Sequence, residues 1–334
     1  MDRDSASVGI RADHIAKRSH LTPEGLIETL FADCPAVYAI LDGNRIAHLP
    51  ELLETSDLPH QCLFQDGMAS GAIAEAAPWL VMLAPDARLT RQLMLSAALQ
   101  TGPVGYWDRH PGIYLQSGLD IDALRRHFRR FLRVQDQRGT AYFFRFWEAE
   151  MAQVYFAALA TQPRQIERWF KPREGGQIDA VLVPDPAAVS DDAPPSFHSF
   201  RPFGLPRLAM PPKGAFSIRD EDLQRFRQVL NNRDITLILD RVRDNFPELS
   251  ARTHDAGFDR WARRFLSRMM DCGFFQKANL LTLLVWELFY GPDFVTRDPS
   301  GQLSALLHGN ADETERFEQM KDLIDDLNLP ENPA

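Results

Sequence analysis

Residues 119–151 read LDIDALRRHFRRFLRVQDQRGTAYFFRFWEAEM, and the interpretation of the whole chain starts from this stretch. Apolar side chains recur in its first part at steps of three and four residues, which predicts an amphipathic helix. They are Ile121, Leu124, Phe128, Phe131 and Leu132. Asp120 or Asp122 can cap the N-terminal end of this helix, where negative charge also interacts favourably with the helix dipole.

A β-hairpin is expected directly after the helix. Residues 131–135 alternate between apolar and polar side chains, and residues 136–139 (DQRG) have the composition of a turn. Residues 141–147 then form a run of aromatic side chains that contains a single charge, Arg145. The stretch therefore predicts a helix, a turn between two strands, and a largely buried second strand.

The other face of the predicted helix is basic. It consists of Arg125, Arg126, Arg129 and Arg130. Such a face could meet phosphate, an acidic protein surface or only solvent, and exposed charges cost little. The formal net charge of the chain is −9, which argues against a general nucleic-acid binder. We therefore expect no nucleic-acid partner, and the choice between an acidic protein and solvent stays open.

Arg145 is expected to be paired. An unpaired charge in an apolar strand would cost several kcal/mol, so Arg145 either lies on a solvent-facing edge or pairs with an acid. Glu148, Asp42 and Asp66 are the candidate partners. We favour pairing, with a structural role first and a binding role second.

The length and composition indicate a globular protein with two domains. The chain has 334 residues, of which 45% are hydrophobic and 25% charged. Its three cysteines show no paired metal spacing, and a reducing cytoplasm is the simple interpretation. Residues 1–20 lack an apolar signal core, and the longest apolar run, residues 280–290, is too short to span a bilayer, which needs roughly 20 residues. We expect a cytoplasmic protein without a membrane partner.

Four segments are expected along the chain. Residues 1–20 read as a flexible leader. In residues 21–183, strand patterns alternate with helix patterns, which predicts a layered α/β domain whose mixed sheet contains parallel pairs and one antiparallel hairpin. Residues 184–216 are rich in proline and read as a linker. Residues 217–330 show helical periodicity throughout and predict an all-α domain, with residues 279–290 as its central helix.

No strong catalytic motif is present. The chain has neither a phosphate-binding glycine-rich loop with a Lys-Ser/Thr pair nor a His-Glu-x-x-His sequence. We therefore expect no catalytic residues, no metal and no cofactor, and hence a protein that is not an enzyme. A hydrolase or a nuclease with an unrecognised active site is the alternative.

Three motifs resemble, in order, those of a family of bacterial type VI secretion effector chaperones, or adaptors, encoded beside the spike protein VgrG. The first is the YAILDG sequence at residues 38–43, and the second is APWL at residues 77–80. The third combines the basic helix, the DxxG turn and the FRFWE strand end at residues 144–148. Family members have Tyr-Asp where this chain has Trp147-Glu148, which keeps the chemical types.

The resemblance implies a non-enzymatic adaptor. Such a protein binds a toxic effector protein in the cytoplasm and loads it onto the VgrG spike, so the effector and VgrG are the expected partners. The α/β domain is the expected site of effector capture, and the helical domain is expected to complete a cleft or to contact the second partner. The expected partner-binding side chains are Arg125, Arg126, Arg129, Arg130, Arg145, Trp147 and Glu148.

Overall fold

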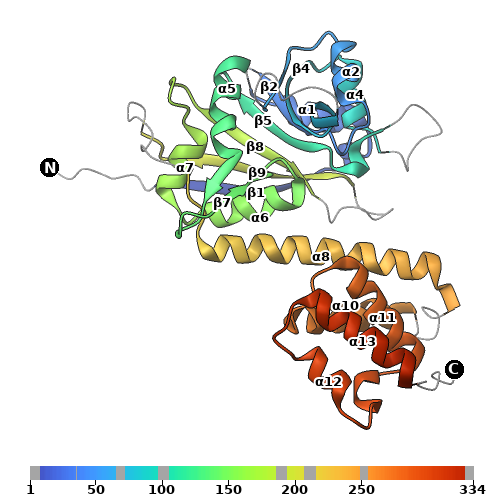
Figure 1. The fold of residues 1–334 in the computed structure, drawn as a ribbon. Coiled ribbons are helices and arrows are strands. Elements are labelled where there is room, and N and C mark those ends of the chain that lie inside the picture. The colour runs from blue at the N-terminus through green and yellow to red at the C-terminus, as the bar shows by residue number, and fades with distance from the viewer. Residues whose placement is uncertain are drawn as a thin grey trace. The chain divides into compact units, whose positions relative to one another are not determined.

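The structure is a computed structural model, and it describes residues 8–34, 36–64, 72–96, 105–185, 194–206, 216–248 and 255–327. The chain divides into two compact units, residues 1–226 (the N-terminal unit) and residues 227–334 (the C-terminal unit). The N-terminal unit combines a sheet with helices, and the C-terminal unit is helical (Figure 1). The predicted fold class, α/β followed by all-α, is confirmed.

A seven-stranded sheet forms the centre of the N-terminal unit, with the strand order β1-β9-β8-β5-β2-β4-β3. Its strands are β1 (Gly9–Ala16), β2 (Val37–Asp42), β3 (His60–Cys62), β4 (Pro78–Leu83), β5 (Gly112–Ser117), β8 (Ile178–Pro184) and β9 (Ser196–Phe203). Every hydrogen-bonded pair of these described strands is antiparallel, so the expected parallel pairs are wrong. The alternation of helix and strand patterns does not indicate parallel pairing here, because β4 lies between β2 and β3 and pairs antiparallel with both.

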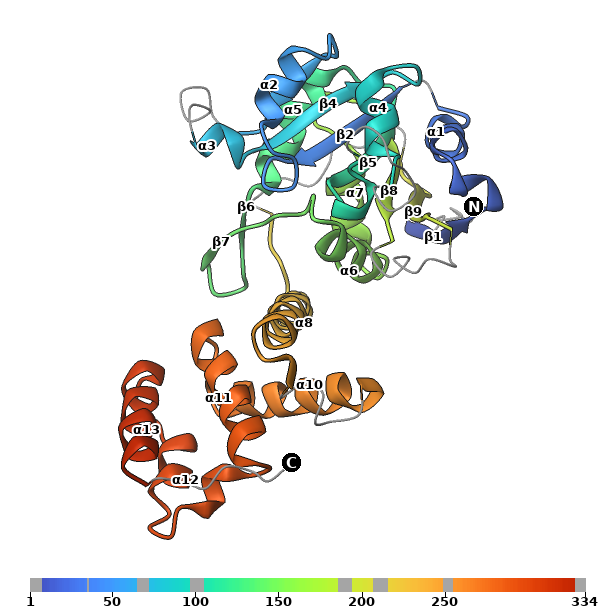
Figure 2. The same ribbon diagram turned by 90° about the vertical axis from the view of Figure 1, so that its right-hand side faces the viewer.

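Helices cover both faces of this sheet (Figures 1 and 2). One layer contains α1 (Pro23–Phe31), α2 (Leu49–Glu54) and α4 (Arg88–Leu93), and the other contains α5 (Ile121–Phe128), α6 (Ala149–Leu159) and α7 (Pro163–Phe170). The unit also contains the short helices η1 (Arg18–Leu21), α3 (Ala72–Glu75), η3 (Trp107–Arg109) and η4 (Arg129–Phe131).

Alternation along the central strand creates two separate cores. Every residue of β2 is buried, as its apolar run predicts. Tyr38 and Ile40 belong to the cluster that also contains α5, α6 and α7, whereas Ala39 and Leu41 belong to the cluster with α1, α2 and α4. Because successive side chains of a strand point to opposite faces, one strand supplies both cores.

The stretch that predicts a helix and a hairpin folds as expected, although its last strand is shorter. Asp120 caps α5, with Oδ1 accepting from the backbone N–H of Ala123 at 2.7 Å. The hairpin strands are β6 (Arg133–Gln135) and β7 (Ala141–Phe143), and Gly139 adopts a φ of 84° in the turn between them. β7 ends at Phe143, and the chain then turns into the core, where the rings of Phe146 and Trp169 lie 5.8 Å apart.

Two strands lie where the sequence predicts a leader and a linker. β1 falls within residues 1–20 and β9 within residues 184–216, and the two strands pair from Gly9↔Phe203 to Ala16↔Ser196. The structure thus differs from the sequence prediction at both segments. β1 has an exposed central part that lacks the apolar alternation of a buried strand, and its partner is distant in sequence.

The C-terminal unit is built from helices (Figure 2), and these pack around an apolar core. Its described elements include α10 (Asp255–Asp271), α11 (Lys277–Tyr290), η5 (Phe294–Arg297), α12 (Gln302–Leu307) and α13 (Glu313–Leu327). The boundary between the units falls within α8 (Asp220–Asn245). α11 contributes Leu280, Leu283 and Leu284 at 0% exposure, in agreement with the expected central helix. Among the described residues, no helix is both long and apolar enough to cross a membrane.

The aromatic run of residues 142–147 allows a matched test of the fold. Phe146 is fully buried, whereas the ring of Phe143 is half exposed. We expect Phe146→Ala to lower the free energy of unfolding by about 3–5 kcal/mol because it leaves a cavity. Phe143→Ala should cost less than about 1 kcal/mol. Urea unfolding measures both, and similar midpoints for the two variants would contradict this placement.

Candidate partner-binding site

Arg145 lies between two acidic side chains. Its Nη2 donates to Oδ2 of Asp42 at 2.8 Å, and its Nε forms an ion pair with Glu148. Asp42 is the last residue of β2, and Glu148 is the N-cap residue of α6. The expected pairing of Arg145 with Asp42 and Glu148 is therefore confirmed, and the third candidate partner, Asp66, lies outside the described residues.

This ion-pair network is primarily structural. The side chain of Asp42 is only 2% exposed, and a carboxylate at such a position needs a charged partner. Arg145 provides that partner from the segment after the hairpin, so the network ties the end of β2 to the start of α6. Trp147 is buried, and the guanidinium carbon of Arg145 lies 5.7 Å from the centre of its ring. Three of the seven predicted binding residues are thus brought together, with Arg145 partly exposed.

The four arginines of the α5 region do not form one free basic face. The Nε of Arg125 donates to the carbonyl oxygen of Cys62 at 2.8 Å, and its Nη2 donates to that of Phe64 at 3.3 Å. The Nη2 of Arg130 lies 2.6 Å from Nδ1 of His127. Arg125 therefore ties α5 to the end of β3, whereas Arg130 bonds to His127 within its own turn.

Arg126 and Arg129 are more available to a partner. The side chain of Arg126 is 58% exposed and lies 3.6 Å from a carboxylate oxygen of Glu174, a distance at which an exposed ion pair contributes little. Arg129 is half-buried in η4, and the structure records no ion pair for it within the described parts of the chain. The residues able to accept an acidic partner are thus two of the predicted four.

Two aromatic side chains pack together near Arg125. Phe64, whose carbonyl oxygen accepts from Arg125, packs edge-on against the exposed ring of Phe143, with 5.8 Å between the ring centres. Arginine and aromatic side chains are both enriched in protein–protein interfaces. We define Phe64, Arg126, Arg129 and Phe143 as the hairpin surface.

His127 is a buried histidine that the sequence analysis did not single out. Its Nε2 donates to the carbonyl oxygen of Trp169 at 2.7 Å, which leaves Nδ1 to accept from Arg130. Burial lowers the pKa of His127 to about 3, so the ring is neutral at physiological pH. The ring thereby links α5 to α7 without a charge, and its polar role is hidden in the sequence because α7 is distant along the chain.

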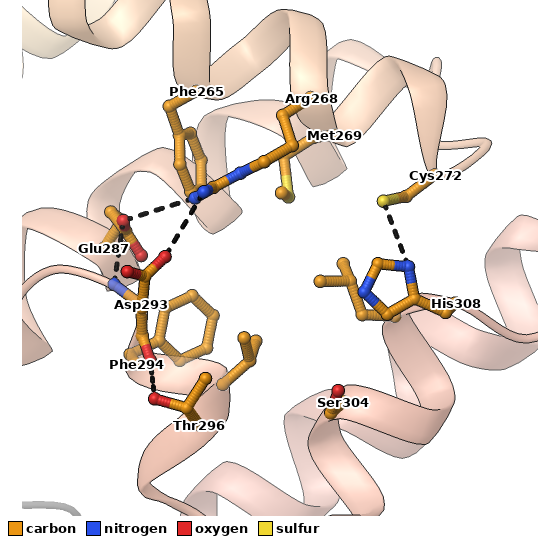
Figure 3. A pocket seen from close by; sticks show the side chains of 12 residues that line it. Phe265, Arg268, Met269, Cys272, Glu287, Asp293, Phe294, Thr296, Ser304 and His308 are labelled. Atoms are coloured by element: carbon orange, nitrogen blue, oxygen red, sulfur yellow. Dashed lines mark hydrogen bonds and ion pairs between the residues drawn. The ribbon is translucent and has the colours of Figure 1, made fainter.

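A pocket in the C-terminal unit brings together polar side chains from α10, α11, η5 and α12 (Figure 3). On one side, Arg268 lies 3.2 Å from Asp293 and 3.7 Å from Glu287. On the other side, Sγ of Cys272 lies 3.5 Å from Nδ1 of His308. No sequence motif indicated this arrangement, because its residues come from separate helices.

The raised pKa of Cys272 bears on whether this pocket could hold a cysteine nucleophile. A cysteine nucleophile reacts as the thiolate, which requires a lowered pKa. Burial instead raises the pKa of Cys272, and burial also raises the pKa of Glu287. The Cys272–His308 pair therefore favours a protonated thiol, and the hydrolase alternative gains no support from this pocket.

The Arg145 network predicts a difference between two arginine variants. Arg145→Ala should lower the free energy of unfolding by about 1–3 kcal/mol, since it leaves the buried Asp42 carboxylate without its charged partner. Arg126→Ala should change it by less than about 0.5 kcal/mol. Urea midpoints test this, and a double-mutant cycle with Asp42→Ala should show coupling between Arg145 and Asp42. Equal midpoints for the two single variants would contradict a structural role for Arg145.

The lowered pKa of His127 predicts that the folded protein loses stability in acid. The unfolded state takes up a proton near pH 6.5, whereas the folded state does so only near pH 3, so the contribution of His127 is complete above pH 6.5 and is lost as the pH falls towards 3. Over this window the loss approaches about 1.4 kcal/mol per pH unit. Urea unfolding at pH 7.5 and pH 5 should show a smaller pH dependence for His127→Gln than for the wild type. An unchanged dependence would show that His127 is not the responsible group.

Comparison with known families supports the resemblance for part of the chain. Residues 37–165 match the family model described as "Domain of unknown function (DUF4123)". The match runs from the start of β2 into the first turn of α7, and it contains the Arg145 network and the hairpin. No curated protein matches the chain, and no solved structure matches it. Residues 37–165 are thus similar to this family, whose description states no activity.

Proposed function

We propose that the protein is an adaptor of a type VI secretion system, which binds a toxic effector protein and loads it onto the VgrG spike. The observation that carries this proposal is the match of residues 37–165 to the DUF4123 family. The first two motifs lie wholly in that segment, as do the basic helix and the hairpin. Members of the resembled family act beside VgrG as effector chaperones.

An adaptor of this kind needs one surface for the effector and another for the spike. We assign effector capture to the N-terminal unit, because the matched segment lies within it. The hairpin surface combines the exposed ring of Phe143 with the exposed side chain of Arg126 and the half-buried side chain of Arg129, and this combination suits an acidic protein segment with an apolar side chain. The C-terminal unit is then available for a second contact.

Arginine suits the recognition of an acidic partner. Its planar guanidinium binds a carboxylate through two parallel hydrogen bonds and stays charged at every relevant pH. Arg125 and Arg130 already make hydrogen bonds within the unit, so a charge reversal there would disturb the fold. Arg126 and Arg129 are the positions at which binding can be tested with the smallest effect on stability.

Charge reversal at the hairpin surface should weaken capture. The double variant Arg126→Glu/Arg129→Glu should remain folded but bind the effector at least tenfold more weakly, since like charges at an interface cost several kcal/mol. Pull-down and titration of the effector and of VgrG measure the effect. Added salt should weaken wild-type binding, because the attraction is between charges.

A matched control distinguishes an effect of this surface on binding from an effect of the change in net charge. Arg18 and Arg164 are exposed side chains of η1 and α7, and Arg18→Glu/Arg164→Glu produces the same change in charge. The control should bind like the wild type. Equal retention of both partners by the two double variants would show that the hairpin surface is only solvated. Failure of the wild type to bind either partner would contradict the adaptor function itself.

A further inference from the structure

Two histidines and one aspartate converge near the β1 edge of the sheet. His14 of β1 and His198 of β9 are directly opposed in the antiparallel pair, and their ring centres lie 4.9 Å apart. Asp185 follows the last residue of β8. Its Oδ2 lies 3.1 Å from Nε2 of His14 and 3.4 Å from Nε2 of His198, so both imidazoles present the same nitrogen to one carboxylate oxygen.

The sheet register positions these three side chains on one face. His198 and Phe200 are two residues apart on β9, and Asp185 lies two residues beyond Val183 of β8. Phe200 and Val183 both belong to the core cluster under α6 and α7. The backbone N–H of Asp185 donates to the carbonyl oxygen of Ser196 at 2.9 Å, which extends the β8–β9 pairing to this position. Because side chains alternate along a strand, His198 and Asp185 lie on the same face as that cluster.

Two of the three distances between the ligand atoms are close to those expected around a tetrahedral metal ion. Zn²⁺ binds histidine nitrogen and carboxylate oxygen at about 2.0–2.2 Å, so tetrahedral geometry places two such ligand atoms about 3.3–3.6 Å apart. The observed separations of 3.1 and 3.4 Å are close to this range, and all three ligand atoms lie within 4.8 Å of one another. Two imidazoles and one carboxylate are also a donor set that Zn²⁺ and similar divalent ions accept.

Each of the two Nε2 atoms lies near more hydrogen-bond partners than it can bond at once. Nε2 of His14 also lies 3.0 Å from the hydroxyl oxygen of Ser196, and Nε2 of His198 lies 2.8 Å from the side-chain amide nitrogen of Gln153. A neutral ring nitrogen offers either one proton or one lone pair. If His198 accepts from Gln153, its Nε2 has no proton for Asp185. A metal ion would instead take the lone pairs of both rings and of the carboxylate together.

We propose that His14, His198 and Asp185 form a binding site for one divalent ion of the Zn²⁺ class, with water in the fourth position. The side chain of His14 is 49% exposed, which gives the ion a route from solvent. Among the described strands β1 lies at the edge of the sheet, beside β9, so the ion would cross-link this edge strand to the ends of two inner strands. The site is independent of the proposed adaptor function, and it replaces the expectation of no metal.

A second group of potential ligands provides a control. His48, Glu51 and Glu75 also bring one ligand atom each within 4.8 Å of the others, but all three residues are exposed. Exposed acidic groups occur often without a bound ion, so we assign no site to this group. His48→Ala therefore removes one histidine without changing the proposed site.

Calorimetric titration of the untagged full chain with Zn²⁺, after removal of metal by a chelator, tests the proposal. The wild type should bind one ion per chain, and the ion should raise the melting temperature because it binds only the folded state. His14→Ala and Asp185→Asn should each weaken binding at least tenfold, and neither should gain thermal stability from Zn²⁺. His48→Ala should behave like the wild type.

Two results would overturn the proposal. One is the absence of saturable Zn²⁺ binding by the folded wild type. The other is binding that His14→Ala leaves unchanged. His14 is an exposed residue of an edge strand, so His14→Ala should fold even if Asp185→Asn does not, and circular dichroism verifies this. Titration with Co²⁺ adds a visible absorption signal from the bound ion, which should be lost in His198→Ala.

Discussion

The burial of β2 on both faces is the constraint from which the N-terminal unit follows. A strand that carries apolar side chains on both faces must be covered on each side, because exposed apolar surface is unfavourable in water. α1, α2 and α4 cover one face, and α5, α6 and α7 cover the other. The neighbouring strand β5 is buried in the same way. The order of layers in this unit is therefore a consequence of its two central strands.

The same constraint explains how Arg145 is used. β2 ends in Asp42, whose carboxylate is buried with the strand and would be unfavourable without a cation. Arg145 supplies the cation, and Glu148 pairs with the same guanidinium at the start of α6. The most unusual charge of the hairpin region thus stabilises the fold first. A partner-binding function has to depend on other side chains, and the hairpin surface offers them.

The four arginines of α5 and η4 share one sequence pattern but have different roles in the structure. In the sequence, its four arginines are equivalent, since all lie opposite the apolar side of one helix. In the structure, Arg125 and Arg130 make hydrogen bonds inside the unit, whereas Arg126 is exposed. The difference arises from what lies beside each position, namely the end of β3 for Arg125 and the buried His127 for Arg130. Periodicity carries no information about such neighbours.

The sequence by itself determined the local structure and the division into an α/β and a helical part. The cap of α5, the hairpin turn and the burial of β2 all follow from the spacing of apolar, acidic and glycine residues over short distances. Only the tertiary structure decided the direction of the strands, the place of β1 beside β9, and the meeting of His14 with His198 and Asp185. These features depend on pairing between segments far apart in the chain, and local residue patterns do not encode which distant strand becomes a neighbour.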